Sequence, residues 1–251
     1  MLEFAITLAR QTGDYISARS TTDFAVEHKG RIDLVTEVDK AAQERIVSAI
    51  ERRFPDHGIV AEEGYRKDGG SGYTWIIDPL DGTTNYVHRL PVYAVSLALY
   101  RGESPLLGVC YNPAAGELFA AETGKGATRN GTPITVSTTT EFVDALVATG
   151  FPYRSQNLEK ITARFFRVVT RAQGVRRLGA AALDLCYVAC GVFDAFWEEG
   201  LAPWDMAAGA LILKEAGGRI TNLDGSPFDL ARGTVIASNS RLHDDLLRCM
   251  E

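Results

Sequence analysis

The sequence predicts a mixed fold of the α+β or α/β class, built as one domain with two lobes. Three observations indicate it: apolar residues at helical spacing near the N-terminus, a strand-rich middle, and strands alternating with helices after Thr140. The 251 residues are enough for two lobes around a shared core, and neither an internal repeat nor an obvious linker divides them. We therefore expect a single domain over residues 1–251, with an α+β lobe over about 1–140 and an α/β lobe over about 141–251.

The first lobe is expected to begin with two amphipathic helices. One covers residues 2–19, and the other follows Thr36 and continues to about Phe54. A strand over 58–61, a glycine-rich loop over 67–72 and a strand over 74–78 come next. The region after these elements should contain a hairpin of strands 106–111 and 117–121, and a tight turn at Asn130-Gly131.

The second lobe alternates between strands and helices. We expect strands over 145–149, 175–178, 192–197, 219–221 and 234–238, and helices over 156–172, 180–190, 204–216 and 240–250.

The composition is that of an ordinary globular protein, with 46% hydrophobic and 23% charged residues. A net charge of −6 without a basic tract argues against binding to nucleic acid or to a membrane surface. The apolar stretch Met1–Ala9 is too short to span a membrane and lacks a signal-peptide cleavage pattern, which favours a cytoplasmic enzyme. We interpret the four cysteines as reduced core residues, because none forms a C-x-x-C pair or neighbours a histidine.

The most informative segment is Trp75–Asn85, which reads W-I-I-D-P-L-D-G-T-T-N. Its apolar start is typical of a buried strand, which we expect to end at Asp78 because Pro79 turns the chain. Asp81 follows three residues after Asp78, and a glycine and two potential helix-capping threonines come next. Two carboxylates can hold a divalent cation, and N–H groups at a helix start can hold a phosphate. The segment therefore indicates phosphate-ester chemistry.

Six carboxylates lie at expected strand ends or helix starts, and several have a purely structural alternative. The acid at position 39 forms a capping-box pattern with Thr36, the acids at 62 and 63 can be an exposed loop pair, and the acid at 205 can favour its helix through the helix dipole. The six residues are Asp39, Glu62, Glu63, Asp78, Asp81 and Asp205.

Asp78 and Asp81 are harder to explain structurally, because two acids at the end of a buried strand repel each other. A bound cation removes that conflict, and all-oxygen ligands select a hard ion such as Mg²⁺. The segment also resembles the D-x-D-G-T motif of haloacid-dehalogenase-type phosphatases, which use an aspartate nucleophile. Here two residues separate the acids instead of one, and no later lysine with a G-D-x-x-x-D element completes that set, so this mechanism remains a competitor only.

Several separated motifs, in one order, resemble the inositol monophosphatase family in its bacterial form. They cover most of the chain: Lys29–Asp39, Ala61–Gly64, Trp75–Tyr86, Gly179–Leu185 and Glu198–Gly209. The resemblance implies the layered αβαβα sandwich of sugar phosphatases, a homodimer, and a Mg²⁺-dependent phosphomonoesterase. It also implies two to three Mg²⁺ ions per active site, with Mn²⁺ able to substitute, and inhibition by Li⁺.

The resemblance further assigns metal ligands. Glu62, Asp78 and the backbone carbonyl of Leu80 would hold one ion, and Asp78, Asp81 and Asp205 would hold a second. A third ion would lie near Glu62 and Glu63, largely through water.

The remaining assignments concern catalysis and substrate. Thr83 and Asp39, beside Glu62, would position and deprotonate the attacking water. Asp81, Gly82 and Thr83 would contact the phosphate side of the substrate, and Glu198 would accept hydrogen bonds from its hydroxyls. The backbone of Gly179, Ala180 and Ala181 would approach the ring, and Lys29 is a further candidate from the first motif.

The substrate is less well defined than the chemistry. Ala202 and Ala180 replace polar residues of the animal pattern, which weakens the expectation of strict inositol specificity. The open alternatives are fructose-1,6-bisphosphatase, histidinol-phosphatase, NADP phosphatase and adenosine bisphosphate nucleotidase activity. A non-enzymatic alternative is a phosphate-ligand sensor or partner-binding scaffold.

Overall fold

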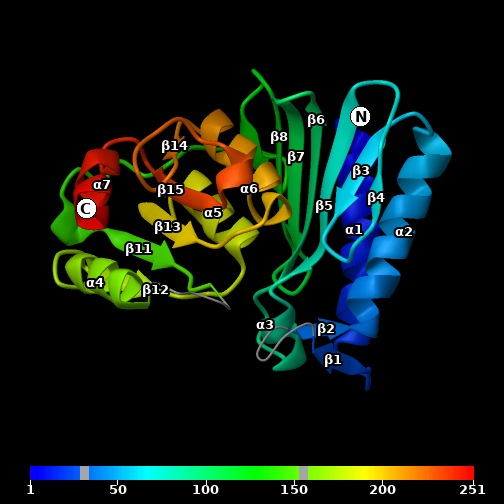
Figure 1. Cartoon of the computed structure of the whole chain (residues 1–251), viewed down its shortest axis with the longest axis horizontal. Coiled ribbons are helices and arrows are strands. Elements are labelled where there is room, and N and C mark those ends of the chain that lie inside the picture. Colours follow the sequence, from blue (N-terminus) through cyan, green and yellow to red (C-terminus); the bar gives the residue numbers. More distant parts are fainter. Residues whose placement is uncertain (29–33, 153–157) are drawn as a thin grey trace.

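Helices and sheets alternate in five layers in this computed structural model, which describes residues 1–28, 34–152 and 158–251. Figure 1 shows the layers from right to left: two helices, a large sheet, two helices, a smaller sheet and two outer helices. The expected αβαβα sandwich is confirmed.

The first layer consists of α1 (Leu2–Arg19) and α2 (Glu37–Arg53). Both helices bury one apolar face, as their periodicity predicts, and both pack on the large sheet. A short antiparallel pair, β1 (Val26–His28) and β2 (Leu34–Thr36), leads into α2.

The large sheet has the strand order β10-β9-β8-β7-β6-β5-β3-β4. Apart from the parallel pair β3–β5, its neighbours run antiparallel. Its strands are β3 (Gly58–Ala61), β4 (Arg66–Lys67), β5 (Tyr73–Asp81), β6 (Ala94–Arg101), β7 (Ser104–Asn112), β8 (Glu117–Glu122), β9 (Ala127–Arg129) and β10 (Thr132–Ile134). The β7–β8 hairpin and the tight turn at Asn130-Gly131 between β9 and β10 are both confirmed.

Strand β5 continues to Asp81, so the expectation that it ends at Asp78 is wrong. Its pairing with β6 shifts register between Asp78 and Asp81, which is the position of Pro79. A residue without an N–H is tolerated at such an irregularity, because no ladder bond is required of it there. As a consequence, both aspartates remain on the same strand end. The loop that was expected over 67–72 begins one residue later in the structure, because Lys67 belongs to β4.

The middle helix layer consists of α5 (Ala181–Ala189) and α6 (Pro203–Glu215), which lies between the two sheets. The smaller sheet has the order β12-β11-β13-β15-β14, and α4 (Leu158–Val169) and α7 (His243–Met250) cover its outer face (Figure 1). Its strands are β11 (Leu146–Thr149), β12 (Gly174–Arg176), β13 (Ala195–Glu199), β14 (Arg219–Thr221) and β15 (Thr234–Ser238).

The apolar cores follow the layers. One cluster fills the space between α1, α2 and the large sheet, and another surrounds α5 and α6. Within the described ranges, no helix has both the length and the apolar character needed to span a bilayer.

Candidate active site

A cavity of about 250 Å³ opens where the end of β5 faces the beginnings of α5 and α6 and the end of β13. Most residues that the sequence singled out line it. They are Glu62, Asp78, Leu80, Asp81, Gly82, Thr83, Gly179, Ala181, Glu198 and Asp205.

The end of β5 places two buried carboxylates in this cavity. Asp78 is 1% exposed and Asp81 is 8% exposed, and each is held by a backbone amide. Leu80 N–H donates to Asp78 Oδ1 over 2.9 Å, and Ala182 N–H, from α5, donates to Asp81 Oδ2 over 2.8 Å. The second bond ties the large sheet to the middle helix layer at the site itself.

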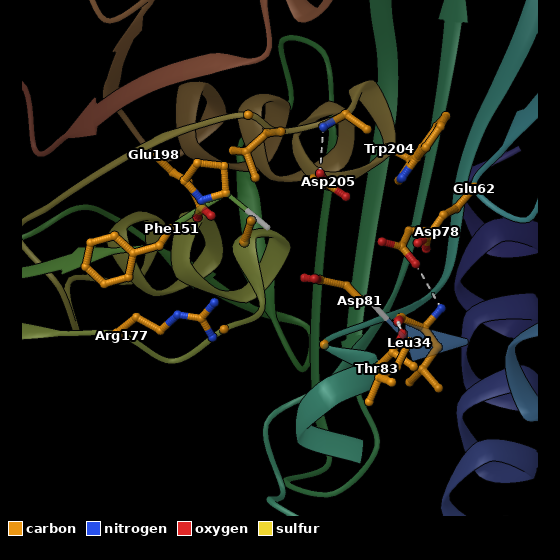
Figure 2. A pocket seen from close by; sticks show the side chains of 18 residues that line it. Leu34, Glu62, Asp78, Asp81, Thr83, Phe151, Arg177, Glu198, Trp204 and Asp205 are labelled. Carbon is orange, nitrogen blue, oxygen red and sulfur yellow. Dashed lines mark hydrogen bonds between the residues drawn. The ribbon is translucent and has the colours of Figure 1, made fainter. Parts of the chain in front are cut away.

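Two further acids reach the cavity from other elements. Glu62 directly follows β3, which pairs with β5, and Asp205 lies in the first turn of α6. Asp205 Oδ2 accepts a 2.7 Å hydrogen bond from the N–H of Ala202, so it caps its helix while it lines the cavity (Figure 2). The capping explanation and the site explanation are therefore compatible.

The electrostatics of these acids are unfavourable for a cluster of anions. Burial raises the pKa of Asp78 well above its usual value, and the charges of Glu62, Asp81 and Asp205 raise it further. Burial, followed by the charge of Asp205, likewise raises the pKa of Asp81 well above its usual value.

This donor set fits a hard divalent cation. The donors are carboxylate oxygens, and a cation would replace the like-charge repulsion with attraction. Among the described residues, no three Asp, Glu, His or Cys side chains are already arranged as a formed metal site. The carboxylates line one cavity, but Asp81 is directed toward the N-terminus of α5 and not toward the other acids (Figure 2).

A second network links Asp39 to Thr83. Asp39 is fully buried in the first turn of α2, where its Oδ2 accepts from the backbone N–H and the hydroxyl of Thr36. Its Oδ1 accepts a 2.9 Å bond from the Thr83 hydroxyl, which also lies 3.1 Å from the Leu80 carbonyl oxygen. The predicted capping box is present, and a hydrogen bond joins Thr83 to Asp39. Burial raises the pKa of Asp39, although these hydrogen bonds oppose that effect.

The chain turns sharply between β5 and the short helix α3 (Thr83–Val87). Gly82 has φ 89°, and a Cβ there would come within 2.9 Å of the Val92 carbonyl oxygen. Only glycine fits this conformation and this approach without strain. The turn presents the first N–H groups of α3 beside the carboxylates.

The opposite side of the cavity is formed by β13 and the segment before α5. Glu198, near the end of β13, is partly exposed, and burial together with the charge of Asp205 raises its pKa to about 8. Asn85 Nδ2 donates to the carbonyl oxygens of Val92 and Leu178, both over 2.8 Å, and so fixes α3 against the segment that carries Gly179.

Three of the predicted residues that the structure describes do not line the cavity: Asp39, Glu63 and Ala180. Glu63 flanks it, and its backbone N–H donates to Gln43 Oε1 over 2.9 Å. Ala180 is the buried N-cap of α5 and lies behind the lining residues. Lys29 lies outside the described residues.

Sequence reasoning overlooked three lining residues, Phe151, Pro152 and Arg177. None of them lies within a motif that carries the family resemblance. Arg177 precedes Gly179 by two residues, and this proximity was the only signal that could have identified it.

Comparison with known proteins agrees with the geometry. Residues 1–250 match the model of the inositol monophosphatase family. An inositol-1-monophosphatase of Synechocystis is 47% identical over 90% of this chain and 79% of its own length, and a Nus factor SuhB of Pseudomonas aeruginosa is 43% identical over 100% and 96%. The crystal structure of the extragenic suppressor protein suhB of Bartonella henselae superimposes with a TM-score of 0.96, at 36% identity over 99% of this chain and 97% of that chain. The chain therefore belongs to the inositol monophosphatase family of metal-dependent phosphoric monoester hydrolases.

Proposed function

We propose that the protein hydrolyses inositol 1-phosphate, or a related polyol or sugar phosphate, with Mg²⁺ as cofactor and water as the nucleophile. The observation that carries this proposal is the convergence of Glu62, Asp78, Asp81 and Asp205 on one cavity beside the start of α3. These acids come from three separate parts of the sequence, and burying them together costs free energy that a cation offsets.

The residues that would hold the cations are the predicted ligands. Glu62, Asp78 and the Leu80 carbonyl would hold one cation, and Asp78, Asp81 and Asp205 would hold a second. Glu62 and Glu63 would hold a weaker third. Divalent cations bound there lower the pKa of water and neutralise charge on the transferred phosphoryl group.

Thr83 and Asp39 orient the attacking water. Because the Thr83 hydroxyl donates its proton toward Asp39, its oxygen can only accept a hydrogen bond from a water in the cavity. This directionality would turn a lone pair of the water toward phosphorus, and Glu62 would receive its proton. No histidine base is needed.

The substrate is oriented by both sides of the cavity. The N–H groups of Gly82 and Thr83 at the start of α3 bind phosphate oxygens, and Asp81 lies beside them. Glu198 contacts a hydroxyl of the alcohol, and the backbone at Gly179, Ala180 and Ala181 borders the ring. Family membership also supports a homodimer, which sedimentation of the purified protein tests.

The test is phosphate release from inositol 1-phosphate, with the alternative sugar and nucleotide phosphates as a panel, in Mg²⁺, in Mn²⁺ and in EDTA. We expect activity only with a divalent cation, and inhibition when Li⁺ is titrated. In a single turnover, oxygen from labelled water should appear directly in phosphate, whereas a trappable aspartyl-phosphate would support the haloacid-dehalogenase mechanism. No release from any member of the panel would favour a binding protein instead.

A further inference from the structure

A second cavity, of about 550 Å³, lies between α1 and α2. We call it the α1–α2 groove and define it by Leu8 and Thr12 on α1 and by Arg45, Ser48, Ala49 and Arg52 on α2. Figure 1 shows these two helices as an outermost layer of the molecule. The groove shares no lining residue with the cavity of the candidate active site, and its volume is in the range that small ligands occupy.

Two arginines of α2, Arg45 and Arg52, line the α1–α2 groove. They are seven positions apart, which is about two helical turns, so they lie on the same face of the helix. Both side chains are exposed, and within residues 1–28, 34–152 and 158–251 neither guanidinium makes an ion pair or a hydrogen bond. Arg19, at the end of α1, pairs by contrast with Glu37. Guanidinium groups whose donors face a cavity unused are suited to oxyanions, which they bind through paired hydrogen bonds.

Contacts with α1 already hold one of these guanidiniums in place. The Cζ atom of Arg45 lies 4.1 Å from the centre of the Tyr15 ring. This contact uses the flat face of the guanidinium, and the N–H groups in its plane remain available to a ligand. Between the two arginines, the small side chains of Ser48 and Ala49 leave the groove open.

The α1 wall of the groove contains a polar group without a partner. Thr12 is 1% exposed, and its hydroxyl oxygen has no hydrogen-bond partner in the part of the chain that the structure describes. A buried hydroxyl without a partner is costly, and native proteins satisfy nearly all such groups. Since Thr12 lines the groove, a polar occupant of the groove can supply this partner.

The charges of the groove favour a dicarboxylate over a bisphosphate. Glu44 is the one acid among the described lining residues, which therefore carry two positive charges and one negative charge. Two carboxylates match the two guanidiniums, whereas two phosphate groups would bring about three to four negative charges close to Glu44. The arginines are separated by about 10 Å along the helix axis, so the two carboxylates should lie at opposite ends of an aliphatic chain. Leu8 and Ala49 offer that chain an apolar surface.

Two competing explanations give the groove no ligand. In the first, the arginines are part of an ordinary solvated helix face, which predicts no saturable binding. In the second, a second copy of the chain covers the groove, which predicts that loss of either arginine changes the association state. Both can be separated from ligand binding by experiment.

We infer that the α1–α2 groove is a binding site for a small aliphatic dicarboxylate, with one carboxylate bound by Arg45 and the other by Arg52. The site is separate from the candidate active site, and the inference does not depend on the proposed function.

The experiment is a titration of the isotope-labelled protein followed by amide NMR, at constant ionic strength, after divalent cations have been removed on a chelating resin. The probes are suberate, a dicarboxylate of eight carbons, the shorter succinate, and octanoate, which has the same length as suberate but one carboxylate. Suberate should shift the amides of α1 and α2 saturably and bind about tenfold more tightly than octanoate, as expected for one additional charge-assisted contact. Succinate should bind more weakly than suberate, because it is too short to reach both arginines.

Variants test the two arginines and the space between them. Arg45→Gln and Arg52→Gln should each lower the affinity for suberate about tenfold, to the level of octanoate. Ser48→Leu keeps both charges but fills the groove, and it should weaken binding as well. The matched control is Arg53→Gln, because Arg53 is also exposed and lies over an aromatic ring, 5.4 Å from the centre of Phe54, but does not line the groove. This control should bind suberate as the wild type does.

Several results would overturn the inference. Equal affinity of the wild type for suberate and octanoate would show that the second carboxylate has no partner, and an equal loss in Arg53→Gln would show that only the net charge matters. Shifts without saturation, or shifts confined to amides of the candidate active site, would show that the groove is not the site. A changed sedimentation coefficient of Arg45→Gln or Arg52→Gln would identify the groove as a contact between subunits instead.

Discussion

Two buried polar clusters in this protein differ in the partners they offer. His243, at the start of α7, is fully buried, and its two ring nitrogens each lie 3.0 Å from a hydroxyl, of Thr221 and of Ser238. Asp78, in the candidate active site, is 1% exposed, but its charged neighbours are the carboxylates of Glu62, Asp81 and Asp205. Both residues have a pKa that is shifted in the direction that favours the neutral form of the side chain.

The comparison shows that a shifted pKa does not by itself identify a functional residue. The cause of the shift is more informative. Burial lowers the pKa of His243 to about 4, and the neutral ring is then satisfied by complementary partners, as expected for a structural group. Asp78 is destabilised by like charges as well as by burial, and that conflict is resolved only by a proton or a cation.

The largest expected effect is that of Asp81→Asn, which tests whether the carboxylates of the candidate active site repel one another and bind a cation. The variant keeps an oxygen that can accept from Ala182 N–H but removes a charge from the proposed cation site. We expect turnover in Mg²⁺ to fall by more than about 100-fold, beyond the usual cost of losing an outer-shell partner of a metal. In EDTA the variant should have a higher melting temperature than the wild type, because the repulsion is relieved.

A suitable control is Asp229→Asn. This residue also accepts from a backbone amide, Ala231 N–H over 2.8 Å, at the start of the 3-10 helix η2 (Leu230–Arg232), and it does not line the cavity. Its turnover and its response to EDTA should match those of the wild type. Near-normal kinetics of Asp81→Asn in saturating Mg²⁺ would show that Asp81 is not a cation ligand.

The second prediction separates the two roles of Asp39, which is both a helix cap and a partner of Thr83. Thr83→Ala breaks only the contact toward the cavity, and kcat should fall about 10- to 100-fold with little change in stability. Thr36→Ala breaks the capping contact and should cost about 1 kcal/mol in the free energy of unfolding, with a much smaller effect on kcat. Steady-state kinetics of both variants measures the change in kcat, and urea unfolding measures the change in the free energy of unfolding.

Asp39→Asn should lower kcat and leave the protein folded. If it simply unfolds, or if Thr36→Ala lowers kcat as much as Thr83→Ala does, capping would be the dominant role of Asp39.

Much of this architecture could be predicted because local sequence patterns determine it. The periodicity of α1 and α2 and the turn residues Asn130-Gly131 depend on near neighbours only. The proximity of Asp78 to Asp81 could be predicted for the same reason. The continuation of β5 through Pro79 was not, because it depends on pairing with β6, whose residues are separate in sequence.

Tertiary contacts also explain why some residues of the site were not predicted from the sequence. Asp205 was identifiable as an acid at a helix start, although a favourable interaction with the helix dipole alone explained it equally well. Arg177 and Phe151 line the cavity only because the segments before α5 and after β11 meet at the end of the large sheet. No local pattern marks a side chain whose position is decided by such a tertiary meeting.

The third prediction concerns His243, the buried residue with complementary partners, and the pH dependence of the stability it provides. The pKa of His243 is about 4 in the folded chain and near its ordinary 6.5 in the unfolded chain, so the unfolded state binds the proton more tightly. The stability that the neutral ring provides is fully present above pH 6.5 and is lost as the pH falls toward 4. The loss amounts to about 3 kcal/mol.

Urea unfolding of the wild type and of His243→Gln at several pH values measures this loss. Contributions from other acids are common to both proteins and cancel in the difference. The gap between the two stabilities should narrow as the pH falls from 7 to 4.5, and a constant gap would mean that His243 is not held neutral by the fold.

The smallest expected effect concerns the surroundings of His243. Arg219, at the start of β14, pairs with Asp244 over 2.9 Å, but both side chains are largely exposed and the pair should contribute less than about 1 kcal/mol at pH 7. The charge of Arg219 nevertheless lowers the pKa of His243, after burial, so Arg219→Gln should raise the pKa of the folded state. The acid-dependent loss of stability should therefore become smaller and level off at a higher pH than in the wild type. If the loss disappeared in Arg219→Gln, the charge of Arg219, and not burial between Thr221 and Ser238, would be the main reason that the ring is neutral, and the contrast with Asp78 would lose its physical basis.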